Sequence, residues 1–162
     1  DWSSDVCSSD LLGFRSILAD PRRAEMRDHL NEKIKFRELF RPFAPSVAAG
    51  FEHRWFDMPQ GGDLATEWML LVAPVKTDVL PATTHVDGTA RVHRVTATAN
   101  PRFHALLTRF GELSGVPALL DTSFNLKGEP IVSSPVQALA TFQRSGLDVL
   151  YLGGHRVERP ES

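Results

Sequence analysis

A stretch rich in short polar side chains interrupts an apolar run near residue 120, and it could bind an anion. The run from Val116 to Leu120 gives way to residues 121–125, which include Thr122, Ser123 and Asn125. These three side chains offer donors and acceptors suited to a phosphate or to the edge of a nucleobase. In open α/β sheets, ligands bind beyond the carboxyl ends of strands, so a strand ending here would open into a binding loop. A polar turn capped by the same side chains is the alternative interpretation.

A second stretch, residues 33–43, alternates cations with apolar residues. If the chain is extended there, Lys33, Lys35 and Arg37 share one face; if it is helical, Lys33, Arg37 and Arg41 align. In either conformation three cations converge and form a wall suited to a polyphosphate. A solvated charged face is the alternative, although such a face has few reasons to carry the three phenylalanines of this stretch.

A third stretch, residues 84–93, combines histidines with an arginine. In a strand that starts at Thr89, Arg91 and His93 would point to the same side, and Arg91 could add a fork of donors to the anion site. His85 could act as an acid, as a base or as a hydrogen-bond donor, although a lone histidine is usually structural. The six histidines show no ligand spacing on a common helix, so the sequence predicts no metal in this segment.

Helices and strands must position these three stretches. A polar residue followed by proline predicts helix starts at Asp20-Pro21, Asn100-Pro101 and Ser134-Pro135. Apolar runs predict strands at residues 17–20 (or a connector), 44–48, 69–75, 89–96, 117–120 and 149–152. Residues 52–67 are predicted to form a loop or hairpin connection. The alternation of helices and strands predicts an α/β sheet with helices packed on it, and the adjacent strands in the middle indicate some antiparallel pairing.

Composition bounds the class of protein. The chain has 162 residues, 42% hydrophobic and 23% charged, which is typical of one soluble domain with a real core. The longest apolar stretch, residues 68–74, is far short of a membrane span, and a cytoplasmic protein is the default expectation. Residues 1–11 show no periodicity and resemble the translated read-through of a sequencing adapter. We therefore expect a foreign or disordered segment there, and a natural chain that continues upstream.

The sequence lacks the common nucleotide-binding fingerprints, since neither the P-loop pattern nor Gly-x-Gly-x-x-Gly occurs. Residues 33–41 mix basic and aromatic side chains as grooves for single-stranded nucleic acid do. The formal net charge is −2, or +1 without the three aspartates of residues 1–11. A nucleic-acid binder usually has a broad basic surface, which a nearly neutral chain does not indicate. A small, highly charged ligand in one pocket fits the sequence better.

Taken together, the motifs resemble the C-terminal domain of the O-carbamoyltransferases that modify nodulation factors, aminoglycosides and cephalosporins. The matching segments are residues 12–22, 35–47, 84–92 and 121–130, and the resemblance runs from Leu12 to near Val157. It implies that residues 12–162 form a YrdC-like α/β domain, with a twisted mixed sheet and flanking helices around a basic cavity. A Lys-x-Arg pair and a Ser-x-Asn element line that cavity in the family.

The resemblance also implies roles for individual residues. The domain would form carbamoyl adenylate from carbamoyl phosphate and ATP, with magnesium bound through the nucleotide phosphates. We expect Lys35, Arg91 and His85 to be the catalytic residues, and the resemblance implies that Arg91 would grip carbamoyl phosphate. The residues expected to bind the nucleotide and the acyl phosphate are Lys35, Arg37, Arg41, Arg91, Thr122, Ser123 and Asn125.

Two departures from the family pattern lead to further expectations. Family members carry an N-terminal actin-like domain that binds iron or another metal and passes the carbamoyl group to a hydroxyl acceptor, and this domain is missing here. Transfer to an acceptor should then be lost. Asp121 stands where we would expect asparagine, and a carboxylate near phosphates weakens anion binding unless it is paired or faces away. A nucleotide-binding module without turnover and a single-strand RNA-binding domain are the alternative functions.

Overall fold

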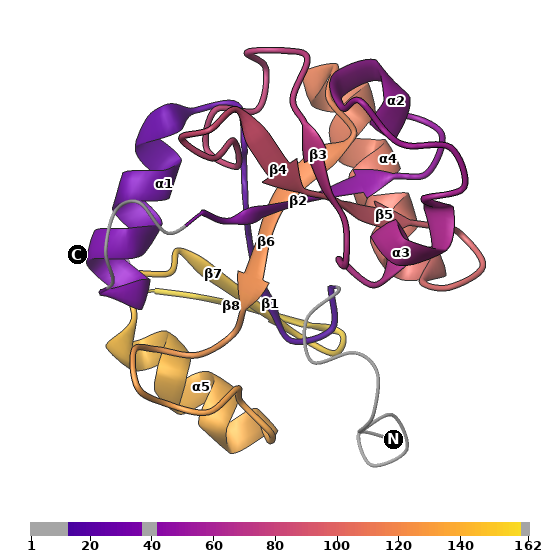
Figure 1. Cartoon of the computed structure of the whole chain (residues 1–162). Coiled ribbons are helices and arrows are strands. Elements are labelled where there is room, and N and C mark those ends of the chain that lie inside the picture. The colour runs from indigo at the N-terminus through magenta and orange to yellow at the C-terminus, as the bar shows by residue number, and fades with distance from the viewer. Residues whose placement is uncertain (1–12, 37–41, 160–162) are drawn as a thin grey trace.

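The fold is built around a four-stranded mixed sheet. The computed structural model describes residues 13–36 and 42–159. In the main sheet β1 (Ser16–Ala19), β6 (Ala118–Ser123), β2 (Ala44–Ala48) and β5 (His93–Val95) lie side by side in that order. β6 is antiparallel to both β1 and β2, whereas β2 and β5 are parallel. β6 crosses the middle of the molecule, beginning near α4 and ending towards α5 (Figure 1).

Two small antiparallel sheets and the helices surround this main sheet. β3 (Val72–Pro74) pairs with β4 (Thr89–Arg91), and β7 (Val149–Leu152) pairs with β8 (His155–Glu158). The helices are α1 (Ala24–Leu30), the π-helix η1 (Asn31–Lys35), α2 (Glu52–Trp55), α3 (Asp63–Glu67), α4 (Pro101–Ser114) and α5 (Pro135–Arg144). None of the described helices is both long and apolar enough to cross a membrane.

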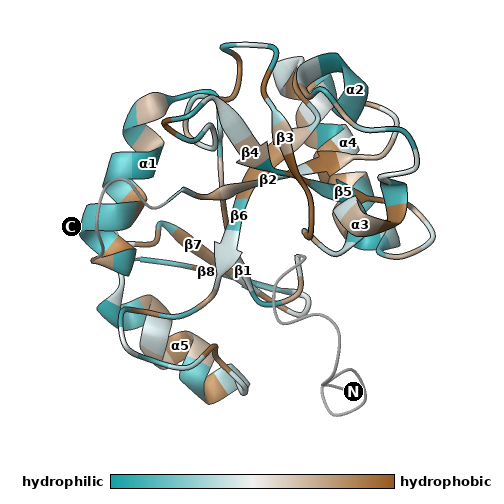
Figure 2. Cartoon of the chain, in the orientation of Figure 1, coloured by the Kyte–Doolittle hydropathy of each residue, from teal (hydrophilic) through white to brown (hydrophobic). Residues whose placement is uncertain are grey.

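The core divides into clusters on the two faces of the main sheet. Leu120 and Phe124 pack with residues of α1, η1 and α5 in one cluster, whereas Leu119 packs with Phe103 and Leu107 of α4 in another. This division follows from the alternation of side chains along β6. Figure 2 shows both polar and apolar colours on α1 and α5, as expected of helices with one buried side.

Local capping signals confirm two of the three predicted helix starts. The Asn100 side chain accepts a hydrogen bond from the Phe103 amide at the start of α4, and Ser134 accepts one from the Gln137 amide at the start of α5. The predicted start at Asp20-Pro21 is wrong. Asp20 instead accepts hydrogen bonds from the backbone and guanidinium of Arg22, and α1 begins only at Ala24.

The strand predictions were confirmed where one strand pairs along its whole length. β2 and β7 have the predicted bounds, and the mixed α/β character is confirmed. The predicted strand 89–96 is wrong as a single element, because the chain changes sheets at Val92, between β4 and β5. The predicted connection at residues 52–67 contains α2 and α3. The YrdC-like twist and the basic cavity remain predictions.

The basic stretch begins in helical form and then changes direction. Lys33 and Lys35 both belong to η1, where Lys33 is exposed and Lys35 is buried, so the extended alternative with both on one face is wrong. Phe36 follows with a left-handed backbone, at a φ of 45°. Arg37 and Arg41, the other predicted phosphate ligands of this stretch, lie outside the described residues.

Candidate functional site

The ammonium of Lys35 lies against the end of β6 and the loop that follows. Its Nζ donates to the Ser123 carbonyl at 2.6 Å and to the Asn125 side-chain oxygen at 2.8 Å. Longer contacts reach the Asn125 carbonyl at 3.1 Å and Ser123 Oγ at 3.2 Å. The structure therefore brings together three predicted site residues that stand 88 and 90 positions apart.

The Ser-x-Asn element is held in shape by its own hydrogen bonds. Ser123 Oγ donates to the Asn125 side-chain oxygen at 2.6 Å, and the amide nitrogen of that side chain donates to the Glu129 carbonyl at 2.8 Å. The Glu129 carboxylate in turn pairs with Arg144 of α5 at 2.7 Å. These bonds fix which atoms of Asn125 face Lys35, because the amide hydrogens point away towards Glu129.

Thr122 does not share the face of its neighbours. Alternation along β6 places the Ser123 and Asp121 side chains on one face of the sheet and Thr122 on the other. Thr122 is buried opposite Ile17 in the β1–β6 ladder. The prediction that Thr122 contributes its side chain to the same site as Ser123 therefore conflicts with the strand, which runs on through Ser123 instead of ending at residue 120.

A buried polar network crosses the sheet next to this site. Ser46 Oγ donates to Asp121 Oδ2 at 2.8 Å and lies 2.7 Å from His93 Nδ1, so one hydroxyl bridges the acid and the imidazole. All three residues are almost completely buried. Sequence reasoning named Asp121 as a departure from the family but did not connect it with Ser46 or His93. The available signal was Ser46, the single polar residue of the otherwise apolar strand β2, whereas β5 and β6 contain further polar residues.

Burial shifts both titratable groups of this network towards their neutral forms. It raises the pKa of Asp121 to about 6, although hydroxyls of Ser16 and Ser46 act in the opposite direction. Burial lowers the pKa of His93 to about 4. At neutral pH the imidazole is therefore uncharged, whereas the carboxylate is ionised and held by Ser46.

Arg91 is the last residue of β4 in the small β3–β4 sheet, and His85 lies in the segment just before β4. Arg91 is exposed and pairs with Val72 of β3 across the ladder. His85 Nδ1 lies 3.1 Å from Thr89 Oγ1. Burial lowers the pKa of His85, Asp87 acts in the opposite direction, and Arg91 lowers the pKa by a smaller effect, so the two predicted residues are close enough to interact. Arg91 and His93 do not share one face as predicted, because the two strands belong to different sheets.

An acidic cluster surrounds Arg94 on β5. Its guanidinium pairs with Glu52 at 3.0 Å, with Glu67 at 2.8 Å and with Asp63 at 3.7 Å. Ligand atoms of Glu52, His53 and Asp63 lie within 4.8 Å of one another, a spacing that a metal could use. Both oxygens of Glu52 are already bonded, one to Arg94 and one to the Gly50 amide. The cluster therefore serves to hold Arg94.

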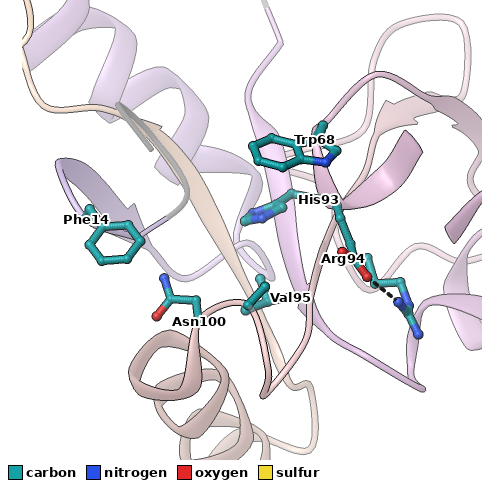
Figure 3. A pocket seen from close by; sticks show the side chains of 8 residues that line it. Phe14, Trp68, His93, Arg94, Val95 and Asn100 are labelled. Atoms are coloured by element: carbon teal, nitrogen blue, oxygen red, sulfur yellow. Dashed lines mark hydrogen bonds and ion pairs between the residues drawn. The ribbon is translucent and has the colours of Figure 1, made fainter. Parts of the chain in front are cut away.

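A small cavity opens beside the network, with a volume of about 110 Å³. His93 lies on its wall, with Trp68 next to it and Phe14 and Asn100 across the opening (Figure 3). Trp68 and Phe14 are each about half exposed, at 50% and 56%. The cavity thus combines flat apolar walls with an imidazole edge.

Comparison with known proteins places the chain in a family. Residues 9–159 match the model of the carbamoyltransferase C-terminus. The chain is 43% identical over 154 residues to nodulation protein NolO of Bradyrhizobium diazoefficiens, covering 93% of this chain and 28% of that protein. It is 42% identical over 151 residues to nodulation protein NolNO of Sinorhizobium fredii, covering 91% of this chain and 22% of that protein.

A third relative carries an enzyme name. The chain is 36% identical over 148 residues to the 3'-hydroxymethylcephem-O-carbamoyltransferase of Amycolatopsis lactamdurans, covering 91% of this chain and 28% of that protein. The chain therefore spans about a quarter of the length of these relatives. Because the family model covers nearly the whole chain, the protein belongs to the carbamoyltransferase family and corresponds to its C-terminal region.

Proposed function

We propose that this chain is the part of an O-carbamoyltransferase that forms carbamoyl adenylate from carbamoyl phosphate and ATP. Water first releases phosphate from carbamoyl phosphate, an oxygen of the resulting carbamate then bonds to the α-phosphorus of ATP, and pyrophosphate leaves. The adenylate would donate the carbamoyl group to a hydroxyl acceptor. Membership in the family and the name of the cephem relative support the carbamoyl chemistry.

The contact of Lys35 with Ser123 and Asn125 carries the proposal. Both reactants are anions, so a cation held at a fixed place must offset their repulsion as they approach. An ammonium has three N–H donors, and the two short contacts occupy two of them. The contacts with the Asn125 carbonyl and with Ser123 Oγ are longer, at 3.1 and 3.2 Å, and therefore weaker. A phosphate oxygen can displace these longer contacts and take a donor whose direction is already set.

The other predicted residues complete the proposed site. Arg37 and Arg41 would bind the ATP phosphates beside Lys35, and Arg91 would grip carbamoyl phosphate through its exposed guanidinium. His85 is neutral at pH 7 because its pKa is lowered, so it would act as a hydrogen-bond donor or acceptor to the substrate. Magnesium would bind through the nucleotide phosphates and offset their charge.

Transfer to the acceptor would need the region that the relatives have and this chain does not cover. In the proposed division of labour, an N-terminal actin-like domain with bound metal receives the adenylate and selects the hydroxyl acceptor. The present chain would stop at the adenylate, which makes its proposed half-reaction measurable alone.

Exchange of labelled pyrophosphate into ATP tests this half-reaction. We expect exchange that requires carbamoyl phosphate and magnesium, and that Lys35→Met and Arg91→Ala abolish. Lys33→Met is the matched control, because Lys33 lies in the same helix η1 but is exposed. A folded chain that binds ATP without exchange would favour the binding module without turnover. Salt-dependent binding of oligonucleotides, weakened by Lys35→Met and indifferent to carbamoyl phosphate, would favour the RNA-binding alternative.

A further inference from the structure

The loop that carries Asn125 leaves the main sheet at Phe124 and returns to it at Val132. Residues 125–131 form this loop, and the chain runs on from the end of β6 towards α5 (Figure 1). The Phe124 carbonyl accepts a hydrogen bond from the Val132 amide at 3.0 Å, and the Phe124 amide donates to the Arg15 carbonyl at 2.8 Å. Arg15, Phe124 and Val132 therefore lie side by side across the neck of the loop.

The side chain of Arg15 closes this neck a second time. Its Nη1 donates to the Val132 carbonyl at 3.0 Å, although the two residues stand 117 positions apart. Val132 is almost completely buried, so its carbonyl needs a partner from within the protein. The guanidinium is that partner, and a charged donor makes a stronger hydrogen bond than a neutral one. Both backbone groups of Val132 are therefore tied to the end of the sheet.

The ammonium of Lys35 is supported in two ways, and only one of them depends on this neck. The Ser123 carbonyl belongs to β6, which is paired on both sides in the main sheet. Asn125 lies beyond β6, and the bond from its side-chain amide to the Glu129 carbonyl stays within the loop. That bond moves with the loop and does not fix the loop to the sheet. The position of Asn125 relative to Lys35 therefore depends on how the neck is closed.

We propose that Arg15 is a positioning residue of the Lys35 site, which closes the neck of the loop and thereby holds the Asn125 side-chain oxygen against the ammonium. This inference rests on the proposed function, which assigns ATP to the Lys35 site. The described bonds of Arg15 go to the backbone of Phe124 and Val132, so it acts on the loop and not on the ligand. Its loss should weaken the contribution of Asn125 and spare that of the Ser123 carbonyl.

ATP binding measured by calorimetry in a double-mutant cycle tests this role. Arg15→Met and Asn125→Ala should each weaken binding about 10-fold, the scale of one hydrogen bond to a charged group. The double variant should bind within about twofold of either single variant, because Arg15 acts through Asn125. Arg15→Lys keeps a cationic donor on a long stem and should bind ATP within about threefold of the unmodified chain. Losses that multiply to about 100-fold in the double variant, or no loss in Arg15→Met, would overturn the proposal.

Hydrogen exchange of backbone amides separates opening of the loop from loss of the whole fold. In Arg15→Met the Val132 amide should exchange at least about 10-fold faster, whereas the amides in the middle of β6 should keep their protection. Arg144→Gln is the matched control, because Arg144 contacts the same loop through the Glu129 carboxylate and not at the neck. Unchanged protection of the Val132 amide in Arg15→Met, or equal loss of protection throughout β6, would contradict a local tie.

Failure of the proposed function would look different from failure of this inference. If ATP binding depends on Arg15 through Asn125 but labelled pyrophosphate does not enter ATP, the half-reaction is refuted and the positioning role stands. If the unmodified chain binds no ATP, hydrogen exchange decides alone. A Val132 amide that loses protection in Arg15→Met and regains it in Arg15→Lys supports the tie, and one that is equally protected in all three chains overturns it.

Discussion

Lys35 and Arg94 are two cations that the fold largely shields from solvent, and it gives them different partners. Lys35 is 7% exposed, and its contacts with Ser123 and Asn125 are to carbonyl, hydroxyl and amide oxygens. The Arg94 side chain is 19% exposed and pairs with the carboxylates of Glu52, Glu67 and Asp63. The contacts with Ser123 and Asn125 orient the ammonium of Lys35, whereas the three carboxylates offset the charge of Arg94.

We propose a binding role for Lys35, whereas the contacts of Arg94 are structural. Hydrogen bonds to carbonyl, hydroxyl and amide oxygens fix the direction of an ammonium, and the contacts of Lys35 with Ser123 and Asn125 are of this kind. Carboxylates around Arg94 join β5 to α2 and α3, because Glu52 belongs to α2 while Glu67 belongs to α3. Burial of a cation is therefore a weak indicator of function until the charge of its partners is known.

Replacing Arg94 should have the largest effect, and it should fall on stability. Arg94→Leu leaves the carboxylate of Glu52, which is 2% exposed, without its cation. Breaking a buried ion pair from one side costs about 3 to 5 kcal/mol, and we expect urea unfolding to show a loss of that order. The control is Arg109→Leu, which breaks an exposed pair with Glu112 and should change the free energy of unfolding by less than about 1 kcal/mol. Similar losses of unfolding free energy for both variants would contradict the structural role of Arg94.

Asp121 and His93 are buried groups whose pKa values are shifted so that the neutral forms are favoured. The two shifts predict opposite dependences of the free energy of unfolding on pH. The folded pKa of Asp121 is raised to about 6, so its contribution to stability is full below pH 3.8 and is lost as the pH rises to about 6. The folded pKa of His93 is lowered to about 4, so its contribution is full above pH 6.5 and is lost as the pH falls to about 4. The two slopes have opposite signs between pH 4 and 6 and largely cancel.

Replacing either group should make the pH dependence of the unfolding free energy that is due to the other group measurable. In Asp121→Asn the free energy of unfolding should rise by about 3 kcal/mol between pH 4 and 6.5, and in His93→Gln it should fall by about 3 kcal/mol between pH 4 and 6. Urea unfolding at a series of pH values measures both slopes. Parallel pH profiles for the two variants would show that the pair does not titrate in this way.

Replacing Lys35 should have a smaller effect, and it should fall on binding. Lys35→Met retains the apolar stem of the side chain but removes the ammonium that we propose donates to the nucleotide phosphates. A loss of about 2 kcal/mol corresponds to roughly 30-fold weaker ATP binding, which calorimetry can measure. Lys33→Met, two residues earlier on the exposed side of η1, should bind ATP normally. Equal losses in the two variants would indicate a diffuse charge effect instead of a directed contact.

Short-range chemistry made part of the fold predictable. The helix starts at Asn100 and Ser134 follow from side chains that satisfy free backbone amides three residues later. The same signal failed at Asp20, because Arg22, two residues later, donates to the carboxylate. Strand 44–48 was predictable because its five residues are buried on both faces and pair throughout.

Long-range pairing made the rest unpredictable from the local pattern. The sequence predicted one strand at residues 89–96, but β4 pairs with β3 whereas β5 pairs with β2, so the chain must change sheets at Val92. The bridge from Ser46 to Asp121 joins positions 75 apart, and no local spacing announces it. Lys35 was connected with the Ser-x-Asn element only through the family resemblance, since local periodicity placed Lys33 and Lys35 on a common face in the extended alternative.

The smallest effect should come from breaking the ion pair between Arg144 and Glu129, next to the loop of Asn125. This change tests whether the Lys35 site is held in shape by charge pairs, as the surroundings of Arg94 are. Arg144 of α5 pairs with Glu129, but Asn125 bonds to the Glu129 backbone carbonyl and not to its carboxylate. Arg144→Gln should therefore leave that carbonyl in place, and ATP affinity should change less than about threefold, because exposed pairs are screened by solvent. Calorimetry at low and high salt measures this. A loss comparable to that of Lys35→Met would mean that a paired charge, and not the backbone bonds of the loop, holds the Lys35 site in shape.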